Sequence, residues 1–296
     1  MRRSGMRARS LAGTKAVLLA LGGLLLGGSL APALPAVRLL VPPGHRGHAP
    51  ALTFPLAYGG NYYGWTSSNW SGYAVTPATG PAGPYTSVSA SWTVPTLVPS
   101  RRATYSAAWV GIDGFDNGEL IQTGTEQDYY RGAQHDAVWW TTNEAGFAEQ
   151  PFTTLSCSAC SFTVSPGDRV QASIVETSAD TWTVTVADLT TGVSGTATGI
   201  SHVGAGASAE WIVEDPALSV NGRTSRLAPL ADYGTTSFDD ALVNGGPPGL
   251  VAGAAASDAG LMVQHGRVVS TPSSPDANAD GFAIAYGPTP PPPPGT

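Results

Sequence analysis

The stretch Trp182-Thr-Val-Thr-Val-Ala-Asp-Leu-Thr-Thr-Gly192 decides the fold class. Apolar and polar residues alternate from Trp182 to Val186, which is the period of a β-strand with one face in a core. Asp188 to Gly192 then supplies turn residues that end in a glycine, as a hairpin requires. This segment predicts a β-strand that ends in a hairpin turn.

The same pattern continues on both sides of this hairpin, and no stretch shows sustained helical periodicity. A dozen or so strands cannot form one open sheet without curling or splitting. The sequence therefore predicts an all-β protein, an antiparallel two-sheet β-sandwich of the concanavalin-like jelly-roll type. The expected strands are Tyr73–Thr76, Ser87–Val94, Tyr105–Ile112, Leu120–Thr125, Ala137–Thr142, Ser161–Val164, Val170–Glu176, Trp182–Asp188, Ala209–Glu214, Thr235–Leu242, Leu261–Val263, Val268–Ser270 and Phe282–Tyr286.

The composition agrees with a turn-rich secreted domain. Of 296 residues only 12% are charged, whereas 37 are Gly and 25 are Pro. Five of the 14 basic residues lie in the first fifteen positions, so nine arginines face 21 acids in the rest of the chain, a net charge of −12. Such a surface has no phosphate-binding footprint, so we expect no nucleic-acid partner.

Both ends of the chain differ from the middle. Basic residues at 2–15, an apolar run at Ala16–Leu30 and Ala31-Pro-Ala33 follow the order of a secretory signal. The run is short for a membrane span of ~20 residues, although an uncleaved anchor is the alternative. We expect a secreted, extracellular monomer with no membrane contact after signal cleavage. The predicted division is 1–33 signal peptide, 34–66 propeptide or flexible arm, 67–287 β-sandwich domain and 288–296 Pro-rich tail.

Several kinds of chemistry lack their motifs. There is no His-Glu-x-x-His, no Gly-x-Ser-x-Gly and no Asp-Thr-Gly, so we expect neither a catalytic metal nor a cofactor. Asp276-Ala-Asn-Ala-Asp-Gly281 begins like a calcium loop, but its twelfth position is Gly287 instead of Glu, which favours a polar turn. Cys157 and Cys160 form one C-x-x-C, which predicts a small-loop disulfide in a secreted chain.

Polar residues inside the expected strands are the candidates for a site. In Ala209–Glu214 the side chains of Glu210, Ile212 and Glu214 share one face. Patterning alone favours a solvated sheet face for the two carboxylates. Gln122 lies in the middle of another strand, directly after an apolar pair.

Five segments together resemble a known family, the glutamic peptidases or eqolisins, in the form of their bacterial secreted members. The segments occur in the family's order from residue 69 to the C-terminal strand. They are Asn69-Trp-Ser-Gly-Tyr73, Trp109-Val-Gly-Ile-Asp-Gly114, Leu120-Ile-Gln-Thr-Gly124, Ala209-Glu-Trp-Ile-Val-Glu-Asp215 and Leu230-Ala-Asp-Tyr-Gly-Thr-Thr-Ser-Phe238.

The resemblance implies a sandwich of two seven-stranded sheets, secretion as a zymogen and endopeptidase action on proteins or peptides in acid. It implies Gln122 and Glu214 as the catalytic pair, with Glu210 as the alternative base. Glu214 would take a proton from the attacking water and return it to the leaving amine. Gln122 would donate a hydrogen bond to the oxyanion. The substrate-binding candidates are Trp70, Trp109, Asp113 and Trp140.

One departure from the family stands out. The family usually has a W-Y-E-x-Y-P-like run where this chain has Trp139-Trp-Thr-Thr-Asn143. The carboxylate is replaced by Thr141, although Glu144 and Glu149 follow. Substrate positioning therefore cannot be carried over from the family.

Other functions remain open on the sequence. An extracellular β-sandwich rich in tryptophan could bind polysaccharide, and the Thr141 departure allows an inactive peptidase homologue. A glycoside hydrolase that uses Glu210 and Glu214 is disfavoured. Positions i and i+4 of a strand lie ~13 Å apart along the backbone, beyond the ~5–9.5 Å that such carboxyl pairs span.

Overall fold

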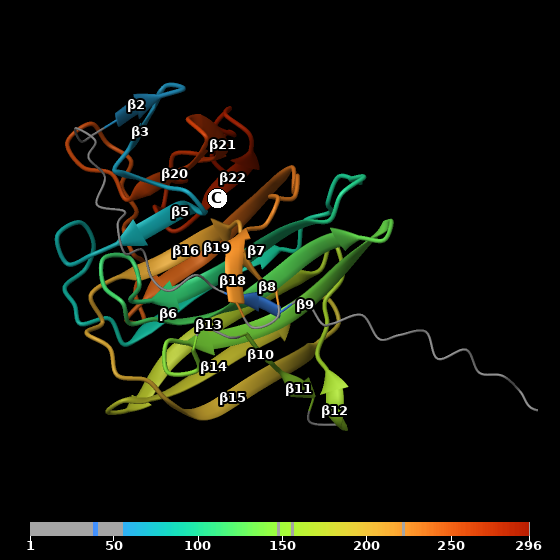
Figure 1. The fold of residues 1–296 in the computed structure, drawn as a ribbon. Coiled ribbons are helices and arrows are strands. Elements are labelled where there is room, and N and C mark those ends of the chain that lie inside the picture. The colour runs from blue at the N-terminus through green and yellow to red at the C-terminus, as the bar shows by residue number, and fades with distance from the viewer. Residues whose placement is uncertain (1–37, 41–55, 147–148, 155–156, 221–222, 296) are drawn as a thin grey trace, which may run out of the picture. The chain divides into compact units, whose positions relative to one another are not determined.

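The computed structural model describes residues 38–40, 56–146, 149–154, 157–220 and 223–295 (Figure 1). Every regular element in these ranges is a β-strand, so the all-β prediction is confirmed. The predicted signal peptide and most of the predicted arm lie outside the described residues. None of the described residues forms a helix long and apolar enough to cross a membrane.

The strands run along the chain in the following order. The first group is β1 (Arg38–Leu40), β2 (Leu56–Tyr58), β3 (Asn61–Tyr63), β4 (Trp65–Ser67), β5 (Trp70–Val75), β6 (Ser87–Thr93), β7 (Thr104–Ile112), β8 (Ile121–Tyr130), β9 (Ala133–Thr142), β10 (Gln150–Pro151) and β11 (Thr153–Thr154). The second group is β12 (Cys157–Ser161), β13 (Arg169–Ser178), β14 (Thr181–Asp188), β15 (Val193–Ser201), β16 (Ala209–Glu214), β17 (Ala217–Val220), β18 (Arg223–Leu227), β19 (Thr235–Val243), β20 (Ala259–Gln264), β21 (Arg267–Pro272) and β22 (Phe282–Tyr286).

One ladder of hydrogen-bonded strands makes up the body of the fold. Its order is β10-β9-β8-β7-β16-β5-β20-β21-β22-β19-β6-β13-β14-β15, and β4 adds to β20 as a parallel neighbour. The β20–β21 hairpin divides this path into two runs of seven strands, as the family resemblance implies. Strands of the second run pack across the first, β13 over β7 and β8, and β6 over β7 and β16. The result is the predicted two-layer sandwich.

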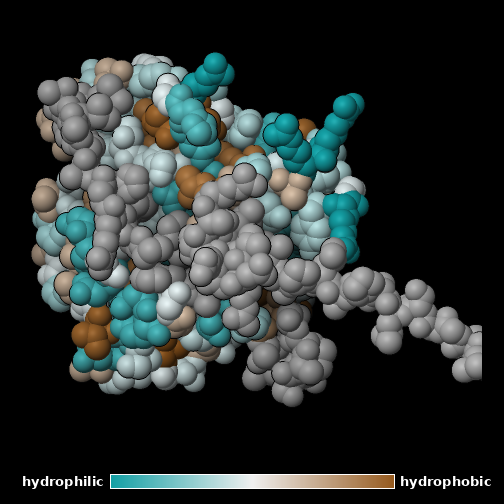
Figure 2. Space-filling model, viewed as in Figure 1, coloured by the Kyte–Doolittle hydropathy of each residue, from teal (hydrophilic) through white to brown (hydrophobic). Residues whose placement is uncertain are grey.

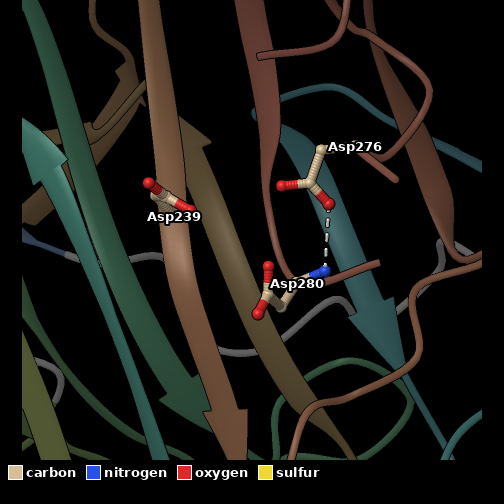
Figure 3. A group of neighbouring side chains, drawn as sticks. All are labelled: Asp239, Asp276 and Asp280. Atoms are coloured by element: carbon tan, nitrogen blue, oxygen red, sulfur yellow. Dashed lines mark hydrogen bonds between the residues drawn. The ribbon is translucent and has the colours of Figure 1, made fainter. Parts of the chain in front are cut away.

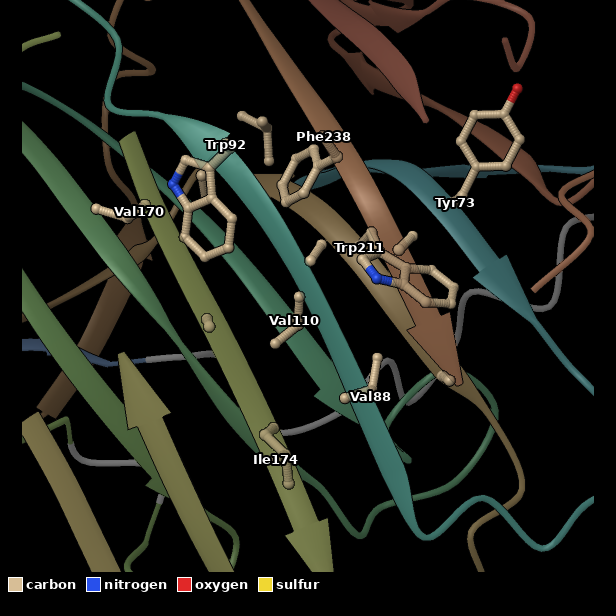
Figure 4. Packing of buried hydrophobic residues seen from close by; sticks show 14 of the residues in the cluster. Tyr73, Val88, Trp92, Val110, Val170, Ile174, Trp211 and Phe238 are labelled. Carbon is tan, nitrogen blue, oxygen red and sulfur yellow. The ribbon is translucent and has the colours of Figure 1, made fainter. Parts of the chain in front are cut away.

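The main core fills the space between the layers. Val110 and Trp211 come from the first run, and Trp92, Val170 and Phe238 from the second; all are buried (Figure 4). Complete burial of a large apolar side chain stabilises a fold by about 1.5–3 kcal/mol. The alternation of each strand thus determines which residues enter this core.

The hairpin turn predicted from the Trp182–Gly192 stretch is present. β14 ends at Asp188 and β15 begins at Val193. The Asp188 carboxylate accepts hydrogen bonds from the backbone N–H groups of Thr190 and Thr191. Gly192 has φ of 76°, a left-handed conformation that suits glycine. Trp182, Val184 and Val186 alternate buried with half-buried neighbours, as predicted.

The strand prediction missed some elements. β15 was not expected, because Val193–Ser201 is rich in Thr, Ser and Gly; it lies at the edge of the ladder with most residues exposed or half-buried. Residues 56–66, assigned by sequence to the arm, contribute β2, β3 and part of β4, and Tyr63 and Trp65 are buried. Ser161–Val164 does not form its predicted strand, because the strand there ends at Ser161.

Figure 2 shows hydrophilic residues over much of the described face, with apolar residues between them.

Cys157 and Cys160 lie in β12, but their side chains are outside the described part of the structure. Their disulfide therefore stays a prediction.

Candidate active site

Two buried carboxylates lie on one face of β16. Glu210 and Glu214 share this face with Ile212, which packs against Trp70 and Trp109 in a second, smaller apolar cluster. The opposite face carries Trp211 and Val213, which belong to the main core. The predicted sharing of faces is confirmed. The expectation of a solvated face is wrong, because Glu210 and Glu214 are 0% and 1% exposed.

The carboxylate of Glu214 is held by N–H donors. The indole Nε1 of Trp109 donates to Oε2 over 2.8 Å, and the amide of Asn69 donates to Oε1 over 3.1 Å. Trp70 also lies within hydrogen-bonding reach. Burial raises the pKa of Glu214 to about 8, and these donors lower it less than burial raises it.

Ser67 determines which way the Asn69 amide points. The Ser67 hydroxyl donates to Asn69 Oδ1 over 3.0 Å and accepts the backbone N–H groups of Asn69 and Trp70. With its oxygen engaged, the amide turns its NH₂ group toward Glu214. Asn69 begins one of the five family segments, but the sequence alone predicted no role for it.

Gln122 is placed on the same face by β8. It is 0% exposed, and neither its amide nitrogen nor its amide oxygen has a partner among the described residues. A buried amide without partners costs free energy unless a ligand satisfies it. Gln122 lies opposite Gly111 of β7 and Thr141 of β9. The Thr141 departure therefore falls directly beside Gln122.

Gly111 brings Gln122 and Glu210 together. It lies opposite both residues, so the three form one row across β8, β7 and β16. A Cβ atom at Gly111 would lie 3.0 Å from Glu210 Oε2 and 3.1 Å from Gln122 Cγ. The absence of a side chain lets these two groups approach each other. Glu214 lies four residues further along β16, opposite Ala107, an offset of about 13 Å by strand rise.

Glu210 itself is poorly compensated. Neither carboxylate oxygen makes a well-formed hydrogen bond with a described residue. Burial raises the pKa of Glu210 well above its usual range, and the nearby Ser208 hydroxyl opposes this shift only in part. The charges of Asp113 and Asp116 raise it further.

A second pair of acids, Glu126 and Glu149, lies near Glu214. Glu126 of β8 lies opposite Ala107, as Glu214 does from the other side. Glu126 and Glu149 are within hydrogen-bonding reach of each other, and burial raises the pKa of Glu126 to about 7. Burial also raises the pKa of Glu149 well above its usual range, with the charges of Glu126 and Glu214 adding to the shift. Glu149 thus supplies a carboxyl group near the site.

Glu144, the other acid that follows Thr141, contacts residues away from Glu214. Glu144 accepts hydrogen bonds from the backbone N–H of Val203 over 3.0 Å and pairs with His202 over 3.1 Å. These contacts connect the loop after β9 to the segment after β15. Of the two candidates, Glu149 is the one whose pKa the charge of Glu214 raises.

The predicted substrate-binding residues separate into two groups. Trp70 and Trp109 lie beside Glu214, edge to face with ring centroids 4.7 Å apart. Trp140 lies on the opposite face of β9, against the main core, whereas Trp139 joins the cluster with Trp70 and Trp109. The position of Trp140 against the main core does not support its prediction as a substrate-binding residue.

Asp113 is engaged with the backbone. Its carboxylate accepts the N–H groups of Gly206 and Ala207 at 2.8 and 2.7 Å, and the Asn117 amide at 2.8 Å. These bonds fix the segment that leads into β16. Asp113 therefore positions a neighbouring loop, and its substrate contact stays a prediction.

The tryptophans of this face are not sugar platforms. Trp70, Trp109 and Trp139 are between 0 and 2% exposed, whereas stacking on a sugar ring needs an open aromatic face. The arrangement instead joins a polar amide to buried carboxylates that hold protons, which suits proton transfer at a peptide bond.

Solved structures of glutamic peptidases have a similar fold. The fold matches scytalido-glutamic peptidase with a transition state analog inhibitor, with a TM-score of 0.57, 23% identity, and coverage of 74% of this chain and 98% of that one. It also matches SCP-B, described as a member of the eqolisin family, with a TM-score of 0.55 and 24% identity over 74% of this chain and 98% of that one. The architecture is that of an eqolisin β-sandwich.

The sequence gives the family. The profile of the Peptidase A4 family matches residues 68–286, and the chain belongs to this family. Aspergillopepsin-2 of Aspergillus niger is 29% identical over 246 residues, which cover 74% of this chain and 78% of that protein. Scytalidopepsin B of Scytalidium lignicola is 29% identical over 172 residues, 56% of this chain and 59% of that protein. The protein is a glutamic endopeptidase, and its substrates are proteins or peptides.

Proposed function

We propose that this protein is a secreted endopeptidase that acts in acid and uses Gln122 and Glu210 as its catalytic pair. One observation carries the proposal: a buried amide and a buried carboxylate, neither with a hydrogen-bond partner among the described residues, approach each other across Gly111. The basic, apolar and small-residue order of residues 1–33 supports secretion. The propeptide at 34–66 and a monomeric state are part of the same proposal.

The raised pKa changes the first chemical step from the one expected. Because burial raises the pKa of Glu210 well above its usual range, Glu210 carries a proton in acid. In our proposal the Glu210 carboxyl gives this proton to the peptide carbonyl oxygen while the water oxygen bonds to the carbonyl carbon. The proton released by that water passes to the other carboxyl oxygen of Glu210. The product is a neutral tetrahedral diol.

The Gln122 amide contributes where charge develops. Its NH₂ group donates a hydrogen bond to the former carbonyl oxygen, which stabilises the transition state. Losing one such donor typically costs ~10²–10³ in rate. The amide is unpartnered without substrate, so the bond is formed without breaking another one in the protein.

The second step releases the amine. Glu210 donates its proton to the amide nitrogen, the C–N bond breaks, and one diol hydroxyl returns a proton to Glu210. The products are a carboxylic acid and an amine, and the enzyme ends in its starting protonation state. Neither step needs a covalent intermediate.

Glu214, the carboxylate that the family resemblance implies, is the competing candidate for this role. The donors around Glu214 favour it, since they stabilise the carboxylate when it has given up its proton. Its offset of about 13 Å from the row of Gly111 and Gln122 favours Glu210, because one peptide carbonyl must lie within hydrogen-bonding reach of both catalytic groups. The two candidates differ in which variant loses activity.

The test is cleavage of an acid-denatured protein substrate by the mature enzyme across pH 2–8. Glu210→Gln and Gln122→Ala are compared with Glu214→Gln, and circular dichroism checks the fold of each. We expect cleavage in acid that is lost in the first two variants and kept in the third. Cleavage that survives Glu210→Gln but disappears in Glu214→Gln would transfer the role to Glu214. A folded wild-type enzyme without cleavage would favour an inactive homologue.

A further inference from the structure

Three aspartates from two parts of the chain that are distant in sequence lie close together. Asp239 lies in β19, and Asp276 and Asp280 lie in the turn that precedes β22 (Figure 3). One carboxylate oxygen of each lies within 4.8 Å of the corresponding oxygens of the other two. Two oxygen ligands of one Ca²⁺ are at most about 5 Å apart, since each Ca–O bond is 2.3–2.6 Å. The spacing is therefore that of ligands around one cation.

A buried, unpartnered oxygen points into this cluster. Asp276 is only 8% exposed, and its Oδ2 has no hydrogen-bond partner among the described residues. The other oxygen, Oδ1, accepts the backbone N–H of Asp280 over 3.3 Å. Figure 3 shows the free oxygen on the side away from that bond. A buried carboxylate oxygen without a donor is costly unless a cation or a proton satisfies it.

Gly281 keeps the space between the carboxylates open. A Cβ atom at this position would collide with Asp276 Oδ2 and would lie 3.2 Å from Asp239 Oδ1. The glycine thus leaves a small gap with carboxylate oxygens at its wall. A side chain at position 281 would fill the place that a cation would take.

No basic side chain of the described residues neutralises these three acids. Arg169 pairs with the neighbouring Asp240 over 3.0 Å, and the other ion pair of the described structure joins His202 to Glu144.

We propose that Asp239, Asp276 and Asp280 bind a Ca²⁺ ion that fastens the turn before β22 to β19. Carboxylate oxygens are hard ligands of the kind that Ca²⁺ prefers, and the remaining positions of its shell would be filled by water or backbone carbonyls. The sequence alone disfavoured a calcium loop, because the twelfth position of that loop is Gly287 instead of Glu. The structure brings the third carboxylate from Asp239, 37 residues before Asp276, which no local motif can show.

The ion would act on stability and not on chemistry. The turn is already attached to its neighbours by backbone hydrogen bonds from Ala241 to the Asp280 carbonyl and from Leu250 to the Ala279 carbonyl. A cation on the three aspartates would remove their mutual repulsion and link both sides of this junction. Binding to the folded state alone raises the melting temperature with ligand concentration.

The test uses the mature protein, stripped with a chelator and dialysed at pH 7. Its melting temperature is measured with added CaCl₂ and with MgCl₂, and terbium luminescence excited through tryptophan reports binding directly. We expect CaCl₂ to raise the melting temperature more than MgCl₂ does. Asp276→Asn should weaken terbium and calcium binding at least tenfold, whereas Asp180→Asn, an exposed aspartate in another turn, should behave as the wild type does.

Two further variants keep the test decisive. If Asp276→Asn does not fold, Asp239→Asn and Gly281→Ala provide the same comparison, since one removes a ligand and the other fills the gap. The proposal is overturned if calcium gives no shift in the wild type, or if the shift is the same in the ligand variants. In either case the three acids are held by protons instead of a metal ion.

Discussion

The two faces of β16 are equally buried but differ in what they bury. Trp211 and Val213 enter the main core, where the Trp211 indole N–H donates to the Ser89 carbonyl over 2.9 Å. On the other face Glu210 and Glu214 are buried as acids with raised pKa values. One face satisfies its polar groups and stabilises the fold. The other leaves both carboxylate oxygens of Glu210 without a hydrogen-bond partner among the described residues, as a site that must bind and react requires.

The largest effect on stability should come from the core face. Trp211→Ala removes a fully buried indole, and such truncations cost about 3–5 kcal/mol. We expect the free energy of unfolding in urea at pH 4 to fall by this amount, with the specific activity of the remaining folded protein little changed. A loss of activity without a loss of stability would contradict the division between the two faces.

The site face should show the reverse result at Gly111. Gly111→Ala would place a methyl group 2.8 Å from the Trp109 ring and close to Glu210 and Gln122. Displacement of reacting groups by about 1 Å can cost 10²-fold in rate. We expect kcat/KM to fall by at least that factor while the melting temperature changes little. Gly118→Ala, which has no atom within 4 Å, is the matched control and should keep full activity.

The buried acids predict how stability depends on pH. Burial raises the pKa of Glu126 and of Asp215 to about 7. An acid whose pKa is raised on folding stabilises the protein fully below its unfolded value, near 4, and loses that contribution as pH rises to the folded value. We expect the free energy of unfolding to fall between pH 4 and pH 7, by about 1.4 kcal/mol for each unit by which a pKa is raised.

Asp215→Asn sharpens this prediction. The amide keeps an oxygen that can accept the hydrogen bond from Gln264, but it has no proton to lose. The variant should be more stable than the wild type at pH 7, and its stability should depend less on pH from 4 to 7. Stability that rises over this range in the wild type would show that these acids are not buried in protonated form.

The smallest effect should come from the residue that orients Asn69. Ser67→Ala removes the hydroxyl that engages Asn69 Oδ1, so the amide can rotate away from Glu214. We expect the free energy of unfolding to fall by about 1 kcal/mol, the typical contribution of one hydrogen bond. The pKa of Glu214, followed by carboxyl NMR, should move upward, because the Asn69 donor lowers it. Ser201→Ala, on an exposed position of β15, should change neither quantity.

Much of the fold was predictable from local pattern, and the site was predictable only in part. The bounds expected for Ala209–Glu214 and Phe282–Tyr286 are those observed. Val193–Ser201 escaped prediction because an exposed edge strand has no apolar alternation to reveal it. In the site, the roles of Asn69 and Glu149 were missed, because each depends on a partner more than 60 residues away.

The sequence by itself determined that this protein is built from strands, which side chains of a strand share a face, and where the hairpin after Asp188 turns. These follow from the two-residue period of the β-strand and from the conformational freedom of glycine. The tertiary structure alone decided that Glu210 and Glu214 are buried, that Trp139 and not Trp140 faces them, and that Asp239 meets Asp276 and Asp280. Those outcomes depend on the register between distant strands and on which face each layer covers, and neither is recorded in any local stretch of the chain.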